Sequence, residues 1–354
     1  MKKYFFITLL VVKSCFLFAQ IPAGYYDSAE GKKGSELKTA LYKIIKDHTV
    51  ISYNDLWEAF KKTDRNPGNN EVWDIYSNCS FRFGDDQCGN YSNECDCYNR
   101  EHSMPKSWFD DKSPMNSDLF HIYPTDGYVN NRRDNYPYGE VDNASYTSGN
   151  GGKLGNNTFE TYTGKVFEPV DEYKGDLARS FFYMVTRYEN IVDTWQYTDE
   201  AKAALNGTKY PAFTQWTLDL LLKWDNDDPV SQKEIDRNDS IYKLQHNRNP
   251  FIDHPEYVCM VWVDTCSASI GSVLHHSHTV SCFYKHRSLR YNITGTHKNI
   301  QVTVYNLLGK QLETRTLKSP YGNFALPYSN SFFIVEFKFN NGDVIRQKII
   351  AVND

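Results

Sequence analysis

The sequence lacks the features of a membrane protein, a fibrous protein or a disordered chain. Beyond residue 20 it has no apolar run close to the roughly 20 residues that cross a bilayer, which excludes a polytopic membrane protein. Only 13 of the 354 residues are proline and 15% are aromatic, a composition that argues against general disorder. The chain also lacks a surplus of positive charge, because 39 Lys and Arg face 44 Asp and Glu, a formal net charge of -5 at pH 7. The composition therefore predicts a folded, water-soluble protein with a core of useful size.

The one long apolar stretch lies at the N-terminus. Two lysines precede an apolar run at residues 4–12, and the small residue Ala19 stands where a signal peptidase would cut. This order is typical of a secretory signal peptide, which we assign to residues 1–20. A membrane anchor is disfavoured because Lys13 interrupts the run. We expect a secreted protein, extracellular or on the cell surface, with no stable membrane span.

Charge is divided unevenly along the chain. From residue 285 onward there are ten Lys and Arg but four Asp and Glu, so the preceding part is more acidic than the whole. An acidic body cannot hold nucleic acid through bulk charge. If the substrate is a polyanion, contact requires a local basic patch and a bound cation.

Cysteine usage points to an oxidising compartment. Of eight cysteines, Cys15 belongs to the signal peptide, which leaves seven for disulfides with one thiol left over. Four of them fall within 19 residues. Their spacing is neither a C-x-x-C pair nor joined to a regular histidine pair, so disulfides are favoured over zinc, with the connectivity open. The four are Cys79, Cys88, Cys95 and Cys97.

Periodicity predicts an α+β fold in two parts. In the body, residues 21–266, apolar residues recur at helical spacing, and the stretch 67–100, rich in Gly, Asn and Cys, is expected to be irregular. The segments expected to be helical are 35–47, 53–62, 175–190, 214–224 and 231–245. Residues 285–354 show alternating segments and an Asn-Gly turn signal at 340–342, which predict a small antiparallel β-sandwich. A Ser- and His-rich linker, 267–284, joins the two parts.

The residues that carry chemistry lie in two blocks. The first, 99–108, contains the Glu101-His102 pair, and the second, 118–135, leads into a short helix expected to begin near residue 125 or 126. A carboxylate beside an imidazole, with amide and guanidinium groups on a nearby helix, supplies a hard-cation ligand, a general base and groups that bind anions. These are the components of metal-assisted phosphodiester hydrolysis.

A Glu-His pair alone is a weak signal. In a regular strand the two side chains point to opposite faces, so they can share a site only where the strand ends or bulges. Pro105, three residues on, is consistent with an ending. His121 is a rival base, but its place between two apolar residues favours a structural role.

The two blocks resemble the ββα-metal core of the bacterial endonuclease I family, secreted and periplasmic nucleases that cut DNA and RNA with little sequence preference. Further segments resemble the same family in the same order, and the likeness covers about residues 21–260. These segments are 174–184, 228–238 and 245–253.

The resemblance implies a ββα-metal nuclease core surrounded by helices, with a role for each matching residue. His102 is implied as the general base that takes a proton from the attacking water. Glu101 and Asn130 are implied as the protein ligands of one Mg²⁺, a role in which Mn²⁺ can substitute. The implied reaction leaves 5′-phosphates.

One part of the family pattern is missing. Some members carry an arginine between the two blocks that contacts the phosphate, and no arginine stands there in this sequence. Its role is expected to pass to Arg132, Arg133 or Lys106, for which solvated surface charges are an equal alternative. Two further clusters have open alternatives. The arginines 179, 187, 237 and 248 could line a substrate groove or be structural, and the histidines in 275–278 are best explained as part of the linker.

The tail also resembles a known module. Segments 302–310, 332–336 and 346–350 are similar to the C-terminal sorting domains of type IX secretion in Bacteroidetes-type bacteria. The resemblance implies that residues 285–354 address the protein to a secretion machinery. The alternative is an accessory β-sandwich that binds carbohydrate or nucleic acid.

The leading hypothesis is a secreted, monomeric, Mg²⁺-dependent endonuclease acting on DNA, RNA or both. One alternative is a secreted ribonuclease acting on RNA only. Another is a cell-surface protein that binds nucleic acid or carbohydrate and has a decayed nuclease core, although intact Glu101, His102 and Asn130 speak against decay.

Overall fold

The computed structural model describes residues 21–263, 280–285, 288–293, 300–306, 310–319, 321–326, 331–339 and 344–351. The chain divides into two units, Met1–Cys266 and Ser267–Asp354, which we call the body and the C-terminal unit. The expected signal peptide, the histidines of 275–278 and the Asn-Gly turn lie outside the described residues. Among those described, no helix is both long and apolar enough to span a membrane.

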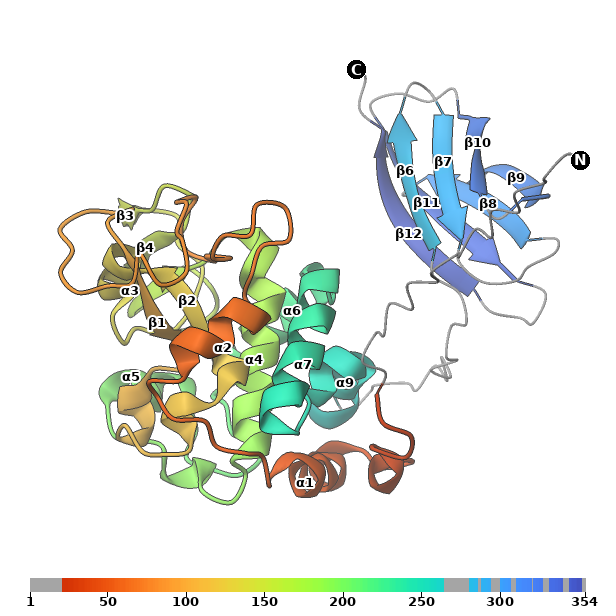
Figure 1. Ribbon diagram of the computed structural model, residues 1–354. Coiled ribbons are helices and arrows are strands. Elements are labelled where there is room, and N and C mark those ends of the chain that lie inside the picture. Colours follow the sequence, from red (N-terminus) through yellow and green to blue (C-terminus); the bar gives the residue numbers. More distant parts are fainter. Residues whose placement is uncertain are drawn as a thin grey trace, which may run out of the picture. The chain divides into compact units, whose positions relative to one another are not determined.

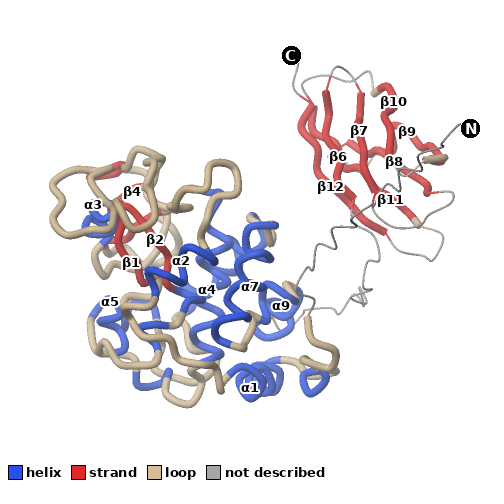
Figure 2. Tube along the Cα trace, viewed as in Figure 1, coloured by secondary structure: helices blue, strands red, loops and turns tan. Residues whose placement is uncertain are grey.

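Helices make up most of the regular secondary structure of the body (Figure 1). They are α1 (Gly34–Ile45), α2 (Leu56–Thr63), α3 (Gly127–Arg133), α4 (Lys174–Arg187), α5 (Asp199–Ala204), α6 (Gln215–Asp227), α7 (Gln232–Gln245), α8 (Pro250–Asp253) and α9 (Glu256–Trp262). The body's strands are β1 (Tyr98–His102), β2 (Ile122–Asp126), β3 (Ala144–Thr147), β4 (Lys153–Asn156) and β5 (Lys165–Glu168). Figure 2 shows that these strands lie together on one side of the body, next to α3, whereas α1, α7 and α9 lie on the other.

Helix α4 is the centre of the body. Every one of its residues is buried, and it packs against α1, α6 and α8. The helices expected from periodicity are all present, with ends that differ by a few residues. Helix α7 begins with a capping box, in which Ser231 accepts from the Glu234 backbone while Glu234 accepts from the Ser231 backbone.

The core of the active-site region is an antiparallel hairpin followed by a helix. Strand β1 pairs with β2 from Tyr98 opposite Asp126 to His102 opposite Ile122, and α3 follows β2 directly. Asp126 caps α3, since its Oδ1 accepts from the Val129 backbone at 2.9 Å. The helix therefore begins where the sequence placed it, and the ββα order of the resemblance is confirmed.

Two disulfides fasten the loop that precedes β1. They join Cys79 to Cys95 and Cys88 to Cys97, so the prediction of disulfides in this cluster is confirmed. The second bridge lies against the start of α3, where a Cβ on Gly127 would come within 2.4 Å of Cys88 Sγ. Only glycine fits there, and the close packing fixes the helix start relative to the loop.

A further three-stranded sheet, in the order β3-β4-β5, was not expected from the sequence. Its strands have four residues each, and exposed positions are frequent along β3. Segments this short carry too few alternating residues to be recognised by period.

The C-terminal unit contains two antiparallel sheets, ordered β10-β7-β6 and β12-β11-β8-β9. Its strands are β6 (Val280–Lys285), β7 (Ser288–Ile293), β8 (Ile300–Asn306), β9 (Gln311–Leu317), β10 (Tyr321–Ala325), β11 (Ser331–Lys338) and β12 (Val344–Ala351). Apolar side chains from both sheets form one core, so the unit is a β-sandwich and the α+β class is confirmed. Strand β6 corrects the expected linker, 267–284, because residues 280–284 belong to this strand.

Candidate active site

The centre of the site is the end of strand β1. Its last two residues are Glu101 and His102, and the chain leaves the strand at Ser103. Because side chains alternate along a strand, Glu101 shares one face with Asn99, and His102 shares the other with Arg100. At the end of a strand a ligand can contact side chains of both faces. The position of Glu101 and His102 at this end therefore meets the condition under which the pair can share one site.

Glu101 is held by two neighbours and is only 3% exposed. Tyr76 Oη donates to its Oε1 at 2.8 Å, and Arg133 forms an ion pair with the same oxygen at 3.0 Å. Burial raises the pKa of Glu101, and Arg133 and Tyr76 oppose that rise. Both of these side-chain contacts end on Oε1, so Oε2 is the oxygen that neither neighbour engages.

His102 has a defined tautomer. Its Nε2 lies 3.1 Å from the carbonyl oxygen of Asn116, and because a carbonyl only accepts, Nε2 carries the proton and Nδ1 is the basic nitrogen. The Tyr53 ring stacks on the imidazole with centroids 5.9 Å apart. Burial lowers the pKa of His102 well below its usual 6.5, and the neighbouring His121 lowers it further. At pH 7 the ring is therefore neutral, the form that a general base needs.

Asn130 lies on α3 and reaches back to β1. Its Nδ2 donates to Asn99 Oδ1 at 2.7 Å, which anchors the amide on the strand face that also carries Glu101. Because Nδ2 is engaged, Oδ1 is the atom left to bind a cation. The structure thus brings the two expected metal ligands to the same side of β1.

A carboxylate oxygen and an amide oxygen on adjacent elements suit a hard cation such as Mg²⁺. The remaining positions of an octahedron would be filled by water and substrate oxygens. Among the described residues, the one cluster of three His, Cys, Asp or Glu ligand atoms within 4.8 Å is Cys79, Cys95 and Asp126. Its two sulfurs are joined in a disulfide, so it is not a metal site.

Arg133 corrects one expectation from the sequence. It is 1% exposed, pairs with Glu101, and donates to the carbonyl oxygens of His102 and Ser103. A phosphate in solvent cannot reach a guanidinium so enclosed. Arg133 instead positions the end of β1 and the Glu101 carboxylate.

The other two expected phosphate contacts are exposed. The Arg132 guanidinium bonds Tyr128 Oη and lies 4.7 Å from the centre of that ring. Lys106 forms an ion pair with Asp111 at 2.7 Å. Both cations face solvent, where a substrate could meet them, and Arg132 lies on α3, the helix that also carries Asn130.

His121 has the structural role that its neighbours predicted. It is fully buried, and its Nε2 lies 2.7 Å from the Met115 carbonyl oxygen. Burial lowers the pKa of His121 to about 4. It lies beside the His102 ring, with centroids 5.4 Å apart. It therefore packs behind the candidate base and does not replace it.

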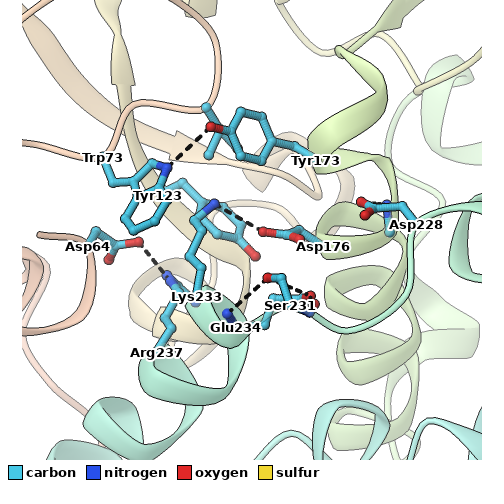
Figure 3. A network of polar contacts seen from close by, with 12 residues as sticks. Asp64, Trp73, Tyr123, Tyr173, Asp176, Asp228, Ser231, Lys233, Glu234 and Arg237 are labelled. Atoms are coloured by element: carbon cyan, nitrogen blue, oxygen red, sulfur yellow. Dashed lines mark hydrogen bonds and ion pairs between the residues drawn. The ribbon is translucent and has the colours of Figure 1, made fainter. Parts of the chain in front are cut away.

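The four arginines that could have lined a groove are buried and paired. Figure 3 shows Arg237 beside Asp64, with Nε 2.7 Å from Oδ1. Arg237 also donates to the carbonyls of Leu119 and Ile122, at 2.8 Å each, and so fixes the chain where it enters β2. The other pairs are Arg179 with Glu234 and Asp225, Arg187 with His48, and Arg248 with Asp239 and Asp253.

Sequence reasoning missed several residues of the site. Asn99 could have been found, because it stands two positions before Glu101 and so shares its strand face. Tyr53 and Tyr76 come from loops distant in sequence, and no local pattern marks them. The Asn116 contact is made by a backbone oxygen, to which sequence identity gives no clue.

Comparison with known proteins defines the class. Residues 33–256 match the model of the Endonuclease I family, and the chain belongs to this family. It is therefore a nuclease, an enzyme that hydrolyses phosphodiester bonds. The alternative of a binding protein with a decayed core is set aside.

The relatives of this chain include proteins named as ribonucleases and one named as a deoxyribonuclease. The chain is 38% identical to an extracellular ribonuclease of Bacillus subtilis (strain 168) over 248 residues, which cover 67% of this chain and 78% of the relative. It is 39% identical to an extracellular ribonuclease of Bacillus amyloliquefaciens over 242 residues, with the same coverage. It is 26% identical over 144 residues to an extracellular deoxyribonuclease of Aeromonas hydrophila, covering 41% of this chain and 52% of that protein.

Proposed function

We propose that this protein is a secreted, Mg²⁺-dependent endonuclease that hydrolyses DNA, RNA or both with little sequence specificity and leaves 5′-phosphates. The observation that supports the proposal is the arrangement of three groups on the ββα core. Glu101 and His102 are adjacent at the end of β1, and Asn130 of α3 is hydrogen-bonded to Asn99 on the β1 face that carries Glu101. Mn²⁺ would substitute for Mg²⁺.

His102 is the general base of the proposed reaction. Its Nε2 is fixed by the Asn116 carbonyl oxygen, so Nδ1 takes the proton from the attacking water. The lowered pKa keeps this nitrogen unprotonated at neutral pH. Tyr53, stacked on the ring, holds the imidazole in place.

Glu101 and Asn130 are the proposed metal ligands. Tyr76 and Arg133 orient the carboxylate through Oε1, and Asn99 orients the amide through Nδ2. When bound, Mg²⁺ would stabilise negative charge on the phosphorane and on the departing 3′ oxygen. The chain's own contribution is to present two oxygens at fixed positions beside the base.

Arg132 and Lys106 are the proposed phosphate contacts. Both are exposed, and neither is enclosed as Arg133 is. Arg132 is the stronger candidate because a planar guanidinium binds phosphate with two hydrogen bonds, whereas an ammonium acts as a point charge.

Two observations support the proposal that the protein is secreted. The N-terminal sequence has the order of a signal peptide, and the named relatives are extracellular enzymes. The C-terminal unit is proposed as a type IX sorting domain that meets the secretion machinery, and the enzyme is proposed to act as a monomer. The unit lies beyond the residues that match the family, which is consistent with a role apart from catalysis.

A narrower function, cleavage of RNA only, is favoured by one observation. The two Bacillus relatives named as ribonucleases share 38% and 39% identity with this chain, against 26% for the deoxyribonuclease. Attack by a metal-assisted water requires no 2′-hydroxyl, however, so the chemistry itself admits both substrates.

The test is digestion of plasmid, single-stranded DNA and RNA by the purified protein, with end groups analysed. We expect cleavage with Mg²⁺ or Mn²⁺, loss of cleavage in EDTA, recovery on adding the metal back, and 5′-phosphate ends. Full activity in excess chelator would overturn the metal assignment. Cleavage of RNA alone would select the narrower function.

A further inference from the structure

Three arginines of the body are neither buried nor paired with an acid. In the described part of the chain, Arg65, Arg100 and Arg132 form no ion pair and remain at least partly exposed. Arg133, by contrast, is buried and paired with a carboxylate, and Arg187, which has no ion pair either, is buried and donates to His48. Each of the three lies over an aromatic ring, at 4.8 Å for Arg65, 3.7 Å for Arg100 and 4.7 Å for Arg132. In an acidic protein, a cation without an acidic partner is the local basic site that a polyanion requires.

Arg100 is the one beside the candidate base. It precedes His102 by two residues on β1 and therefore lies on the same strand face. Its guanidinium lies over the rings of Tyr53 and Trp57, at 3.7 and 4.5 Å. Tyr53 also stacks on His102, so the cluster of Tyr53, Trp57 and Arg100 is in direct contact with the candidate base.

The side chains of Tyr53, Trp57 and Arg100 are all half-buried. The Arg100 guanidinium donates to the Tyr53 carbonyl oxygen at 2.7 Å and also bonds the Tyr53 side chain. A guanidinium has five N–H groups, so most of its donors remain for a ligand. The rings hold the cation in place without neutralising it.

A planar cation between two aromatic side chains has the chemistry to bind a nucleotide. Guanidinium N–H groups bind phosphate oxygens, and unpaired bases stack on aromatic rings and on guanidinium planes. Bases within a duplex are stacked on one another and cannot offer their faces in this way. The ligand class that fits is a single-stranded nucleic acid.

We propose that Tyr53, Trp57 and Arg100 form a subsite for the nucleotide next to the scissile phosphate, and that this subsite gives the enzyme a preference for single strands. The proposal rests on the proposed function, because the neighbouring phosphate is the one that His102 and the metal ligands address. It adds a phosphate contact on β1 to those proposed for Arg132 and Lys106.

Binding measurements separate this proposal from the catalytic one, because they need no turnover. The probe is a fluorescent 12-nucleotide single strand with phosphorothioate linkages, and its dissociation constant for the full chain is measured in Mg²⁺ by anisotropy across a salt series. Arg100→Gln is expected to weaken binding about 10- to 100-fold at low salt, the worth of a charge-assisted hydrogen bond. The slope of log K against log salt should fall by about 0.7, the value for one phosphate contact on a single strand.

Trp57→Leu should weaken binding by about 5- to 100-fold with an unchanged salt slope, because stacking releases no counterions. Trp57→Phe should restore most of the loss. The matched control is Arg82→Gln, which removes the same charge from an exposed arginine that pairs with Asp85 and Asp86. Circular dichroism verifies folding. Trp57 packs against Phe60 and Tyr98, so Arg100→Gln carries the test alone if Trp57→Leu does not fold.

Two results would overturn the proposal. One is a salt slope for Arg100→Gln equal to that of the wild type and of Arg82→Gln. The other is an equal loss of affinity for the single strand and for the matching phosphorothioate duplex. If the wild type binds as expected but cleaves nothing, the proposed function fails while the subsite stands.

Discussion

The body and the C-terminal unit treat polar groups in opposite ways. The body buries many charged side chains, among them Lys38, Asp118 and Arg179, whereas in the described part of the C-terminal unit Thr303 is the one buried polar residue. Burying a charge is costly unless it is paired and hydrogen-bonded. The body meets that requirement through ion pairs between distant segments, while the sandwich packs apolar side chains from two sheets.

The buried charges of the body lie where the site needs support. Arg133 joins α3 to the end of β1 through Glu101, and Arg237 joins α7 to the chain entering β2 through backbone carbonyls. Asp118 accepts from Tyr183 and Tyr188, at 2.9 Å each, directly before that same entry. The difference between the two units therefore suggests a division of labour, in which catalysis belongs to the body alone.

The largest effect should come from the base itself. We predict that His102→Ala lowers the cleavage rate by about two to four orders of magnitude, the usual worth of a general base, while nucleic-acid binding persists. The rate is measured on single-stranded RNA and DNA with saturating Mg²⁺. His246→Asn is the control, because His246 is an exposed histidine at the end of α7. Near-normal turnover in a folded His102→Ala protein would contradict the assignment.

Acid should destabilise the body through His121. Its pKa is about 4 in the fold, because of burial, against 6.5 for an ordinary histidine, so between these values the unfolded chain binds a proton that the folded chain does not. Stability is therefore lost as pH falls from about 6.5 to 4, by up to about 3 kcal/mol from this group. His121→Gln, which keeps a donor for the Met115 carbonyl, should flatten the slope of unfolding free energy against pH.

Tryptophan fluorescence isolates this effect. All seven tryptophans of the sequence precede residue 263, so guanidinium unfolding followed by their emission reports the body and not the C-terminal unit. The comparison is between pH 7 and pH 4.5, for the wild type and the variant. Equal losses of stability in both proteins would show that His121 does not titrate as described.

A smaller effect is expected from the residue that orients Asn130. Asn99→Leu removes the acceptor of the Asn130 Nδ2 hydrogen bond, so the amide is free to turn its Oδ1 away. We expect the affinity for metal to fall about 10-fold, at the lower end for groups that support a ligand. Asn99→Asp keeps an acceptor and should keep the affinity. Mn²⁺ binding, followed by electron paramagnetic resonance, measures this without turnover, and equal affinities in the two variants would contradict the role.

The sequence predicted those parts of the molecule that depend on local pattern. The longer helices α1, α2, α4, α6 and α7 and the alternating strands β8, β11 and β12 follow from period and turn chemistry, and the start of α3 was expected to within two residues. The shorter helices α5, α8 and α9 were not predicted. The disulfide-rich loop followed from cysteine spacing and the secretory context. The family resemblance supplied the residues Glu101, His102 and Asn130, whose grouping the strand end then explained.

Long-range pairing was beyond local pattern. Arg237 and Asp64 are 173 residues apart, and nothing near either one indicates the other. Arg133 was expected at the substrate because its helix carries amide and guanidinium groups, but its place one turn after Asn130 turns it toward Glu101. Strands β3 to β5 are too short for period to distinguish them from loops.

The smallest effect should come from removing the C-terminal unit. One might suppose that this part holds the substrate, because from residue 285 onward ten Lys and Arg face four Asp and Glu. Its charges are scattered along alternating strands, however, and catalysis requires only that a phosphate reach Glu101, Asn130 and His102. We predict that a chain ending near Ser267 cleaves nucleic acid at close to the full-length rate when purified, but does not reach the medium or the cell surface in the native host. The same truncated protein tests both the cleavage rate and the export. If the truncated protein folds, as judged by circular dichroism, yet loses most of its activity in a salt-sensitive way, then the unit binds substrate and the division of labour between the two parts is wrong.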